Sequence, residues 1–313
     1  MHKIPCVSVI MSVFNGEDFL ADAIKSVLRQ TFTNFEFIII DDGSKDSSLV
    51  IIQSFQELDP RIKVIVHKNQ GLAKSLNVGI ENSIGKYIAR IDADDLCYES
   101  RLEKQYAFME ENHAVDLIGS SVDVINEDGS ITASKKQITD FENIFKKRFL
   151  LSPILHITFF GKRSFFERNN GYRDSFVFAQ DYDLVLRGID SGSIILNMEE
   201  QLVQYRDFRR KINPSKFIQQ FRITELAIRL SRERSKFGKE VSDLNLEFQK
   251  IKKVKPFEIF MVNIFLKTYF LDHSLKDKAL KNFINILVFI INPDLRRLLV
   301  RDFRAYKLSS ENE

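Results

Sequence analysis

Three carboxylates stand within four positions at the end of an apolar run in the segment ARIDADDLCYE, residues 89–99. Asp92, Asp94 and Asp95 repel one another when all three are ionised. A solvated surface loop tolerates such repulsion, whereas a bound cation converts it into attraction. The residue types and their spacing therefore indicate a candidate metal site at this point of the chain.

A second acidic pair, Asp41 and Asp42, follows the apolar run FEFIII. If the two preceding segments are parallel strands, their carboxyl ends meet at one edge of a sheet, where the ligands of such sheets bind. Hard cations such as Mg²⁺ are commonly held by one or two carboxylates together with phosphate oxygens and water. We therefore expect the first pair to receive the polar part of a nucleotide and the second cluster to receive the metal and the diphosphate.

Other ligand-binding motifs do not account for these acids. The interval from Asp92 to Glu103 matches the first and last ligands of a calcium loop, but Cys97 stands where that loop requires glycine. Neither a P-loop nor a GxGxxG fingerprint is present, and no HExxH or cysteine pair indicates zinc. An acidic pocket like that of response regulators could use Asp41 and Asp42, but it would leave the second cluster unexplained.

The elements that must position these acids alternate between strand and helix patterns. Apolar, β-branched runs predict four strands and amphipathic spacing predicts three helices between them, which together form βαβ units and a mostly parallel sheet. The strands are expected over 6–14, 35–44, 61–68 and 85–95, and the helices over 16–30, 47–58 and 71–83. Further on, we expect a helix over 100–112, a strand over 115–125 turning into 131–136, a helix over 179–192, and helices from about 214 to the end.

Charge is divided unevenly along the 313 residues, although the net charge is only +3. Residues 205–313 hold 24 Lys and Arg against 13 Asp and Glu, a net of +11, whereas residues 1–204 carry a net of −8. A basic tail on an acidic body predicts a carboxylate-rich site in front and an anionic partner behind. The N-terminal segment MHKIPCVSVIM lacks the features of a secretion signal, and the two cysteines form no ligand-type spacing, so we expect a cytoplasmic protein.

Several motifs in order resemble those of the inverting family 2 glycosyltransferases of the GT-A fold. The resemblance runs from VSVIMSVFNGEDFLADAIKSVLRQTF through IIIDDGSKDSS, GLAKSLNVGI and ARIDADDLCYESRL to GYRDSF and AQDYDLVLRG. It implies an α/β fold with a Rossmann-like, mostly parallel sheet flanked by helices and followed by a helical extension. The expected parts are a nucleotide-sugar half over 1–100, an acceptor half over 101–205 and a basic amphipathic helical extension over 206–313.

The resemblance also assigns roles on the nucleotide side. Ser12 and Phe14, after the first strand, would flank the base, and Phe14 stands where the family often has tyrosine. Asp42, with Asp41 beside it, would hydrogen-bond the base.

Metal binding and catalysis are assigned in the same way. Asp92 and Asp94 match the DxD motif, with Asp92 near the ribose and Asp94 ligating Mn²⁺ or Mg²⁺ on the diphosphate. Asp181 matches the general base that deprotonates the acceptor, and Gln180 replaces the glutamate that usually precedes it.

Neighbouring polar residues have structural interpretations that compete with functional ones. Asp95 is as compatible with a helix N-cap as with a ligand role. Asp183 is better explained as a helix N-terminal acid, and Arg173 and Arg187 as ion-pair partners. His156 could lie near the diphosphate or acceptor, or it could be a hydrogen-bonded core residue.

The basic tail has two interpretations. Its longest uncharged run, 282–293, is too short for the roughly 20 residues that span a bilayer. Its apolar segments either form core helices or lie on an anionic membrane surface, and the positive charge favours the membrane. The membrane-facing cations would be Arg296, Arg297, Arg301, Arg304 and Lys307. No nucleic-acid recognition module is present, so nucleic acid is not an expected partner.

Together these observations predict a metal-dependent, inverting hexosyltransferase. It would move a hexose or N-acetylhexosamine from a UDP-linked donor to a saccharide acceptor, lipid-linked through polyprenyl diphosphate. The setting would be synthesis of a surface polysaccharide of the O-antigen or capsule type, peripheral to the inner face of the cell membrane. The alternative is a catalytically inactive GT-A-fold scaffold protein at the membrane.

Overall fold

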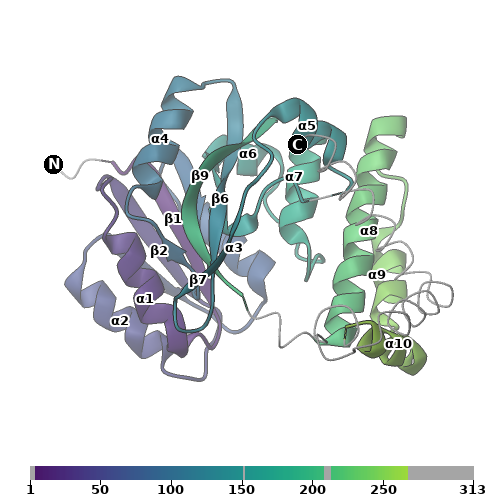
Figure 1. Cartoon of the computed structure of the whole chain (residues 1–313), viewed down its shortest axis with the longest axis horizontal. Helices are drawn as coiled ribbons and strands as arrows, with labels where there is room; N and C mark the ends of the chain where they lie inside the picture. Colours follow the sequence, from purple (N-terminus) through teal and green to yellow (C-terminus); the bar gives the residue numbers. More distant parts are fainter. Residues whose placement is uncertain (1–3, 151, 208–212, 267–313) are drawn as a thin grey trace. The chain divides into compact units, whose positions relative to one another are not determined.

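The chain forms two compact units, shown in the computed structural model of Figure 1. The structure describes residues 4–150, 152–207 and 213–266. The first unit consists of 1–146 and 152–207, and the second of 147–151 and 208–313. The first is an α/β domain built on one sheet, and the described part of the second is helical.

The first unit is organised by a mixed sheet whose strands come from all parts of residues 7–206. The strands are β1 (Val7–Val13), β2 (Phe35–Asp41), β3 (Ile62–Val66), β4 (Tyr87–Arg90), β5 (Leu96–Cys97), β6 (Val115–Ile125), β7 (Ile131–Lys135), β8 (Phe160–Lys162) and β9 (Ile194–Arg206). Their order is β3-β2-β1-β4-β8-β6-β9-β5, with β7 paired to β6. The first four strands run parallel, as do β6 and β9, and the other pairs are antiparallel.

Helices cover both faces of this sheet (Figure 1). They are α1 (Glu17–Leu28), α2 (Ser48–Leu58), α3 (Leu72–Glu81), α4 (Arg101–Glu111), α5 (Phe141–Lys147), α6 (Arg163–Arg168) and α7 (Gln180–Asp190). Helices α1, α2 and α4 contribute to one hydrophobic core, and α3, α6 and α7 contribute to the other. The sheet is therefore buried on both sides, which explains why β1 and β2 are apolar runs rather than alternating ones.

The sequence patterns predict the elements of the first hundred residues correctly, apart from the short strand β5. Each strand and helix expected between residues 6 and 95 is present, and the parallel βαβ arrangement is confirmed. The expected hairpin of β6 and β7 and the helix α7 are also present. The short strands β5 and β8 and the long strand β9 were not predicted. Strands from both expected halves, 1–100 and 101–205, lie in the one sheet.

The second unit contains α8 (Pro214–Phe237), α9 (Leu244–Lys252) and α10 (Pro256–Leu266). Asn213 caps α8 by accepting hydrogen bonds from the backbone N–H groups of Ser215 and Lys216, and proline occupies the first helical position. Gly238 ends the same helix at a φ of 70°, a conformation that favours glycine. The cations predicted to face a membrane, from Arg296 onward, lie outside the described residues.

A buried arginine fastens α4 to the sheet. Arg101 is fully buried, and its Nη2 donates to the carbonyl oxygens of Arg90 at 2.7 Å and Phe159 at 3.3 Å. Its Nε donates to Gln105 Oε1 at 3.0 Å, and its Nη1 contacts Cys97 Sγ at 3.2 Å. Arg101 therefore satisfies the backbone at the point where β4 ends and the acidic segment begins.

We expect Arg101→Ala to lower the free energy of unfolding by about 3 kcal/mol, because it leaves buried carbonyl groups without their charged donor. Urea denaturation would measure the loss. Lys104→Ala is the matched control on the same helix, since Lys104 only forms an exposed ion pair with Glu200; it should change stability by less than about 0.5 kcal/mol. Equal effects of the two substitutions would contradict this account.

Candidate active site

The carboxyl ends of β1, β2 and β4 bring the predicted site residues to one edge of the sheet. In the parallel register, Val13 lies beside Asp41, and Ile10 lies beside Arg90. The segments that follow these strands carry Phe14, the Asp41–Asp42 pair and the acidic segment 92–95. The expectation that the two acidic groups gather at one edge is therefore confirmed.

The two acids after β2 differ in how they are bonded. Asp42 accepts hydrogen bonds from the backbone N–H groups of Gln70 at 2.7 Å and Gly71 at 3.0 Å, and His67 Nδ1 lies 3.3 Å from its Oδ1. Asp41 Oδ2 accepts a weak bond from Ser44 N at 3.3 Å, whereas its buried Oδ1 has no hydrogen-bond partner among the described residues. Asp42 thus holds the loop that leads into α3 with both of its carboxylate oxygens. Of the two acids, Asp41 is the one with an oxygen available to accept a hydrogen bond from a ligand.

The loop after β1 presents an aromatic ring beside this pair of acids. Ser12 is partly buried within β1, and Phe14 is 50% exposed. Asn15 has a φ of 52°, and its N–H and side-chain carbonyl bond the 44–45 segment after β2. The two loops therefore hold each other in place, with the ring of Phe14 available for stacking.

The segment after β4 gathers its three carboxylates. Asp92, Asp94 and Asp95 each offer an oxygen atom, and these atoms lie within 4.8 Å of one another. Arg90 donates to both carboxylate oxygens of Asp92, at 2.8 Å to Oδ2. Asp95 is buried, and its Oδ2 accepts no hydrogen bond from any residue that the structure describes. A cluster of oxygen ligands with an unpartnered buried oxygen suits a divalent cation.

The pKa values of the clustered carboxylates also favour the binding of a cation. Burial, and then the neighbouring Asp92, raises the pKa of Asp94 to about 6. Burial, followed by the charges of Asp92 and Asp94, raises the pKa of Asp95 well above its usual range. The ionised forms are therefore destabilised in the protein alone, and a cation would stabilise them.

The interpretation of Asp95 as a helix N-cap is wrong. The helix after the cluster begins at Arg101, with Ser100 in the cap position, and β5 lies between. Instead, Asp95 Oδ1 accepts a 2.6 Å hydrogen bond from the backbone N–H of Arg206 at the end of β9. Asp95 therefore joins the acidic segment to a strand that lies far away in the sequence.

Asp181 lies in the first turn of α7, as the sequence predicts, and its side chain is partly buried. Desolvation by the surrounding protein raises the pKa of Asp181 and outweighs the opposite effects of the Tyr182 backbone N–H and Arg90. The charge of Asp92 raises it further. Asp181 therefore shares the electrostatic environment of the Arg90–Asp92 pair, and its carboxylate is a better proton acceptor than an exposed one.

Asp183, two positions further along α7, has the structural role that was predicted. It is fully buried, with Arg187 Nε at 2.8 Å and Arg173 Nη1 at 3.6 Å. Arg187 also donates to the carbonyl oxygen of Gly171 at 2.7 Å. The predicted ion-pair roles of Arg173 and Arg187 are therefore confirmed.

The loop before α7 is held from its other side by Asn77 of α3. The Asn77 side chain donates to the carbonyl oxygen of Tyr172 at 2.7 Å and accepts from the Tyr172 N–H at 2.8 Å. Gly171 has a φ of 58°, and a Cβ atom there would lie 2.4 Å from Asn77 Oδ1, so only glycine fits. Asn77 thus connects the nucleotide-side half of the domain to the segment that carries Tyr172.

The partly buried His156 pairs with the buried Tyr172. Its Nε2 lies 2.8 Å from the Tyr172 hydroxyl, and its ring packs edge-on against Phe159 at 4.9 Å between centroids. Burial, and then the charge of Arg90, lowers the pKa of His156 well below its usual range, so the imidazole is neutral. Its contacts are those of a hydrogen-bonded, packed residue, and its proximity to the diphosphate or acceptor stays a prediction.

Two site residues were missed from the sequence. Arg90 is only 3% exposed and neutralises Asp92; its position as the one charge in the run YIARI was the available signal, because a buried charge requires a partner. Arg206 was missed because β9 itself was not predicted.

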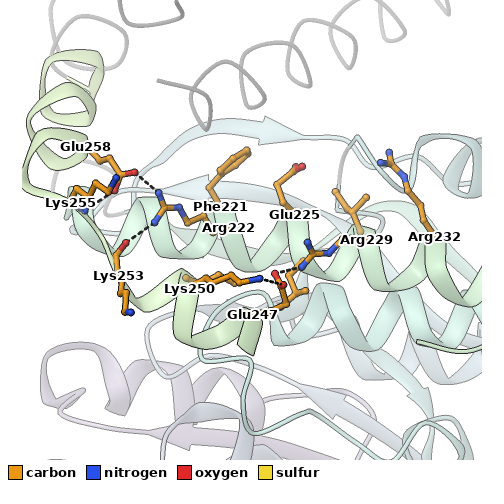
Figure 2. Close-up of a pocket in the computed structure, with 13 residues that line it drawn as sticks. Phe221, Arg222, Glu225, Arg229, Arg232, Glu247, Lys250, Lys253, Lys255 and Glu258 are labelled. Carbon is orange, nitrogen blue, oxygen red and sulfur yellow. Dashed lines mark hydrogen bonds and ion pairs between the residues drawn. The ribbon is translucent and has the colours of Figure 1, made fainter. Parts of the chain in front are cut away.

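A second candidate binding region lies in the helical unit. α8, α9 and α10 line a pocket of about 730 Å³, shown in Figure 2. Its charged lining residues are Arg222, Arg229, Arg232, Lys250, Lys253, Lys255, Glu225, Glu247 and Glu258. Arg222 pairs with Glu258 at 2.7 Å, and Arg229 and Lys250 share Glu247. The lining has more cations than carboxylates, so the pocket is positively charged.

Comparison with known proteins identifies relatives of the chain. A family model described as glycosyl transferase family 2 matches residues 8–169. The chain is 36% identical over 211 residues to the putative glycosyltransferase EpsE of Bacillus subtilis, covering 66% of this chain and 75% of EpsE. It is 31% identical over 211 residues to the O-antigen biosynthesis glycosyltransferase WbnJ of Escherichia coli, covering 64% and 79%.

Solved structures share the fold at low identity. Staphylococcus aureus TarS 1–349 in complex with UDP-GlcNAc superposes with a TM-score of 0.57 at 18% identity, covering 96% of this chain and 89% of TarS 1–349. The mannosyltransferase PcManGT from Pyrobaculum calidifontis, in complex with GDP-Man and Mn²⁺, gives 0.58 at 13%, covering 96% and 84%. These similarities confirm the expected GT-A fold.

Because the pKa of Asp94 is raised, we expect the free energy of unfolding to depend on pH and on the presence of a bound metal ion. In metal-free buffer, stability should fall as pH rises from about 4, the unfolded value, to about 6, the folded value, because the folded state binds the proton more tightly. Asp94→Asn lacks this loss, so at pH 7.5 its melting temperature should exceed that of the wild type by at least about 2 °C. Calorimetry would measure both.

Mn²⁺ provides the complementary measurement. At pH 7.5 it should raise the melting temperature of the wild type and leave that of Asp94→Asn unchanged, because a bound ligand stabilises only the protein that retains its site. A wild-type melting temperature that does not respond to Mn²⁺ or Mg²⁺ would contradict the metal site.

Proposed function

Because the chain belongs to glycosyl transferase family 2, we propose that it is a metal-dependent, inverting hexosyltransferase. It transfers a hexose or N-acetylhexosamine from a nucleotide sugar to a saccharide acceptor. The observation that carries this proposal is the arrangement at one sheet edge. A three-carboxylate cluster with an unpartnered buried oxygen lies there, and Asp181 shares its electrostatic environment.

Residues after β1, β2 and β4 bind the donor. Phe14 stacks on the base beside Ser12, and the Asp41–Asp42 pair accepts its hydrogen bonds, with the open acceptor on Asp41. Asp92, held by Arg90, lies on the ribose side, and Asp94 is the metal ligand. A bound Mn²⁺ or Mg²⁺ supplies neutralisation of the negative charge that develops on the departing diphosphate.

Asp181 activates the acceptor. Its carboxylate takes the proton of the acceptor hydroxyl as the hydroxyl oxygen forms a bond to C1 of the sugar. On the opposite face the bond between C1 and the diphosphate oxygen breaks, and the nucleoside diphosphate leaves with the electron pair. One displacement inverts C1 and needs no covalent intermediate. The elevated pKa of Asp181 suits it to this proton transfer.

UDP is the proposed nucleotide of the donor, and synthesis of a surface polysaccharide of the O-antigen or capsule type is the proposed setting. Support comes from the fold shared with TarS, whose structure was determined with UDP-GlcNAc, and from the similarity to WbnJ, an O-antigen biosynthesis enzyme.

The acceptor is lipid-linked, and the helical unit contacts the anionic inner face of the cell membrane peripherally. No helix within the described ranges is long and apolar enough to cross a bilayer. The positive pocket of Figure 2 supports this contact. Beside it, Phe257 and Phe260 on α10 are more than half exposed, and Lys253 and Lys255 are exposed next to them in sequence. Exposed aromatic rings beside lysines suit a membrane interface.

Asp181→Asn should lower kcat for transfer about 10²- to 10⁴-fold, because it removes the proton acceptor. UDP-sugar affinity, measured by calorimetry, should stay within about 3-fold of wild type, because Asp181 acts on the acceptor rather than on the nucleotide.

The pH dependence of the wild-type rate gives a second test. Because the pKa of Asp181 is raised, the rate should fall on the acidic side of the profile at a pH above the ordinary aspartate pKa of about 4. Undiminished turnover in Asp181→Asn would contradict its role as the base, and no activity of the wild type with any donor would favour the scaffold alternative.

The membrane contact can be tested separately from catalysis. Vesicles that contain anionic phospholipid should sediment the wild-type chain, and the double substitution Lys253→Glu and Lys255→Glu should reduce the bound fraction several-fold, because each basic residue near such a surface contributes about 1 kcal/mol. Lys25→Glu, an exposed lysine on α1, is the control and should bind as wild type does. Equal binding of all three proteins would argue against contact through this segment.

A further inference from the structure

Arg206 is the last residue of β9 and one of the most deeply buried charged residues of the domain, at 4% exposure. Its main chain pairs with β6, where it lies beside Ile125 in the parallel register. The side chain leaves the end of the strand toward the acidic segment 92–95. No role for this residue follows from the sequence motifs.

Two consecutive acids of the cluster are held by Arg206. Its backbone N–H donates to Asp95 Oδ1 at 2.6 Å, and its Nε donates to the carbonyl oxygen of Asp94 at 2.9 Å. The first bond occupies Oδ1 of Asp95 and leaves Oδ2 as its oxygen without a hydrogen bond among the described residues. The second bond holds the main chain that carries the Asp94 carboxylate. Neither bond occupies a carboxylate oxygen of Asp94.

The opposite side of the guanidinium is anchored to two other segments. Nη1 donates to the carbonyl oxygens of Asn126 at 2.6 Å and Glu127 at 2.8 Å, in the turn between β6 and β7. The guanidinium carbon lies 4.2 Å from the ring centroid of Phe19 on α1. Because three segments contact the Arg206 side chain, it has little conformational freedom. It can therefore restrict the movement of the acidic segment relative to the sheet.

We propose that Arg206 is a positioning residue that holds Asp94 and Asp95 in the geometry that binds the divalent cation. This inference rests on the proposed metal site at Asp94. Residues that orient metal ligands without touching the metal typically change metal affinity by 10- to 100-fold when they are replaced. Arginine is required because its planar fork reaches both the Asp94 carbonyl and the hairpin turn, which a lysine ammonium cannot do at once.

The charge of Arg206 contributes to the same role. Its guanidinium donates to the backbone carbonyl groups of Asp94, Asn126 and Glu127. In these bonds the cation offsets repulsion within the cluster without occupying a carboxylate oxygen of Asp94.

Arg206→Gln tests the proposal. Mn²⁺ would be titrated into the protein at pH 7.5 with saturating UDP, and free Mn²⁺ would be read from its electron paramagnetic resonance signal. We expect Mn²⁺ affinity to fall 10- to 100-fold, whereas UDP affinity measured without metal should stay within about 3-fold of wild type. Arg206→Lys should not restore the affinity. Equal Mn²⁺ affinity in wild type and Arg206→Gln would overturn the proposal.

Arg61→Gln is the matched control. Arg61 also donates to a backbone carbonyl, that of Leu28 at 3.2 Å, and lies 4.4 Å from a ring centroid, that of Phe35, but it is distant in the fold from the acidic segment. Its replacement should lower stability without changing Mn²⁺ affinity. If Arg61→Gln weakened Mn²⁺ binding as much as Arg206→Gln did, the effect would be general loosening and the proposal would fail.

Phe19→Leu provides a milder variant for the case in which Arg206→Gln does not fold. It removes the ring under the guanidinium but keeps every hydrogen bond, and it should weaken Mn²⁺ binding by about 2- to 5-fold. Unchanged affinity in this variant, together with an unfolded Arg206→Gln, would overturn the proposal. If the wild type itself bound no Mn²⁺, the proposed metal site would fail first, and the role of Arg206 with it.

Discussion

The mutual repulsion of three carboxylates at the end of β4 is the constraint on which the site depends. Arg90 neutralises Asp92 from within the sheet, and Arg206 holds the main chain of Asp94 and the side chain of Asp95. The remaining negative charge is not compensated by the described protein groups, as the elevated pKa of Asp94 indicates. The repulsion that remains would be relieved by a divalent cation, as the proposed metal site requires.

Much of the fold was predictable because its signals are local. Each βαβ strand of the first hundred residues is an apolar run bounded by turn residues, and the acids at the ends of β2 and β4 identified the sheet edge in advance. β9 mixes polar and apolar residues and is stabilised by β6, far away in sequence, so no window of sequence identifies it. Because β9 was not predicted, Arg206 was not recognised as a site residue, and Asp95 was interpreted as a helix N-cap.

Environment, rather than residue type, separates the two acids of α7. Asp183 is fully buried and forms ion pairs with Arg187 and Arg173, so its charge has a structural role. Asp181 is partly exposed, has no ion pair within the described residues, and has a raised pKa, which suits the proton transfer proposed for it. The sequence motif assigned different roles to the two acids, and the positions of the arginines supply the physical reason for the structural role of Asp183.

Helix α3 connects the two halves of the domain at fixed points. Its N-terminus is held by Asp42 through Gln70 and Gly71, and Asn77 clamps the loop at Tyr172. A single-residue insertion between Gly71 and Asn77 would rotate Asn77 by about 100° around the helix axis and break the clamp. The two anchor points therefore constrain the length of this segment more tightly than the identity of its exposed side chains. A substitution on the exposed face would keep both anchors, whereas an insertion or deletion would break one of them.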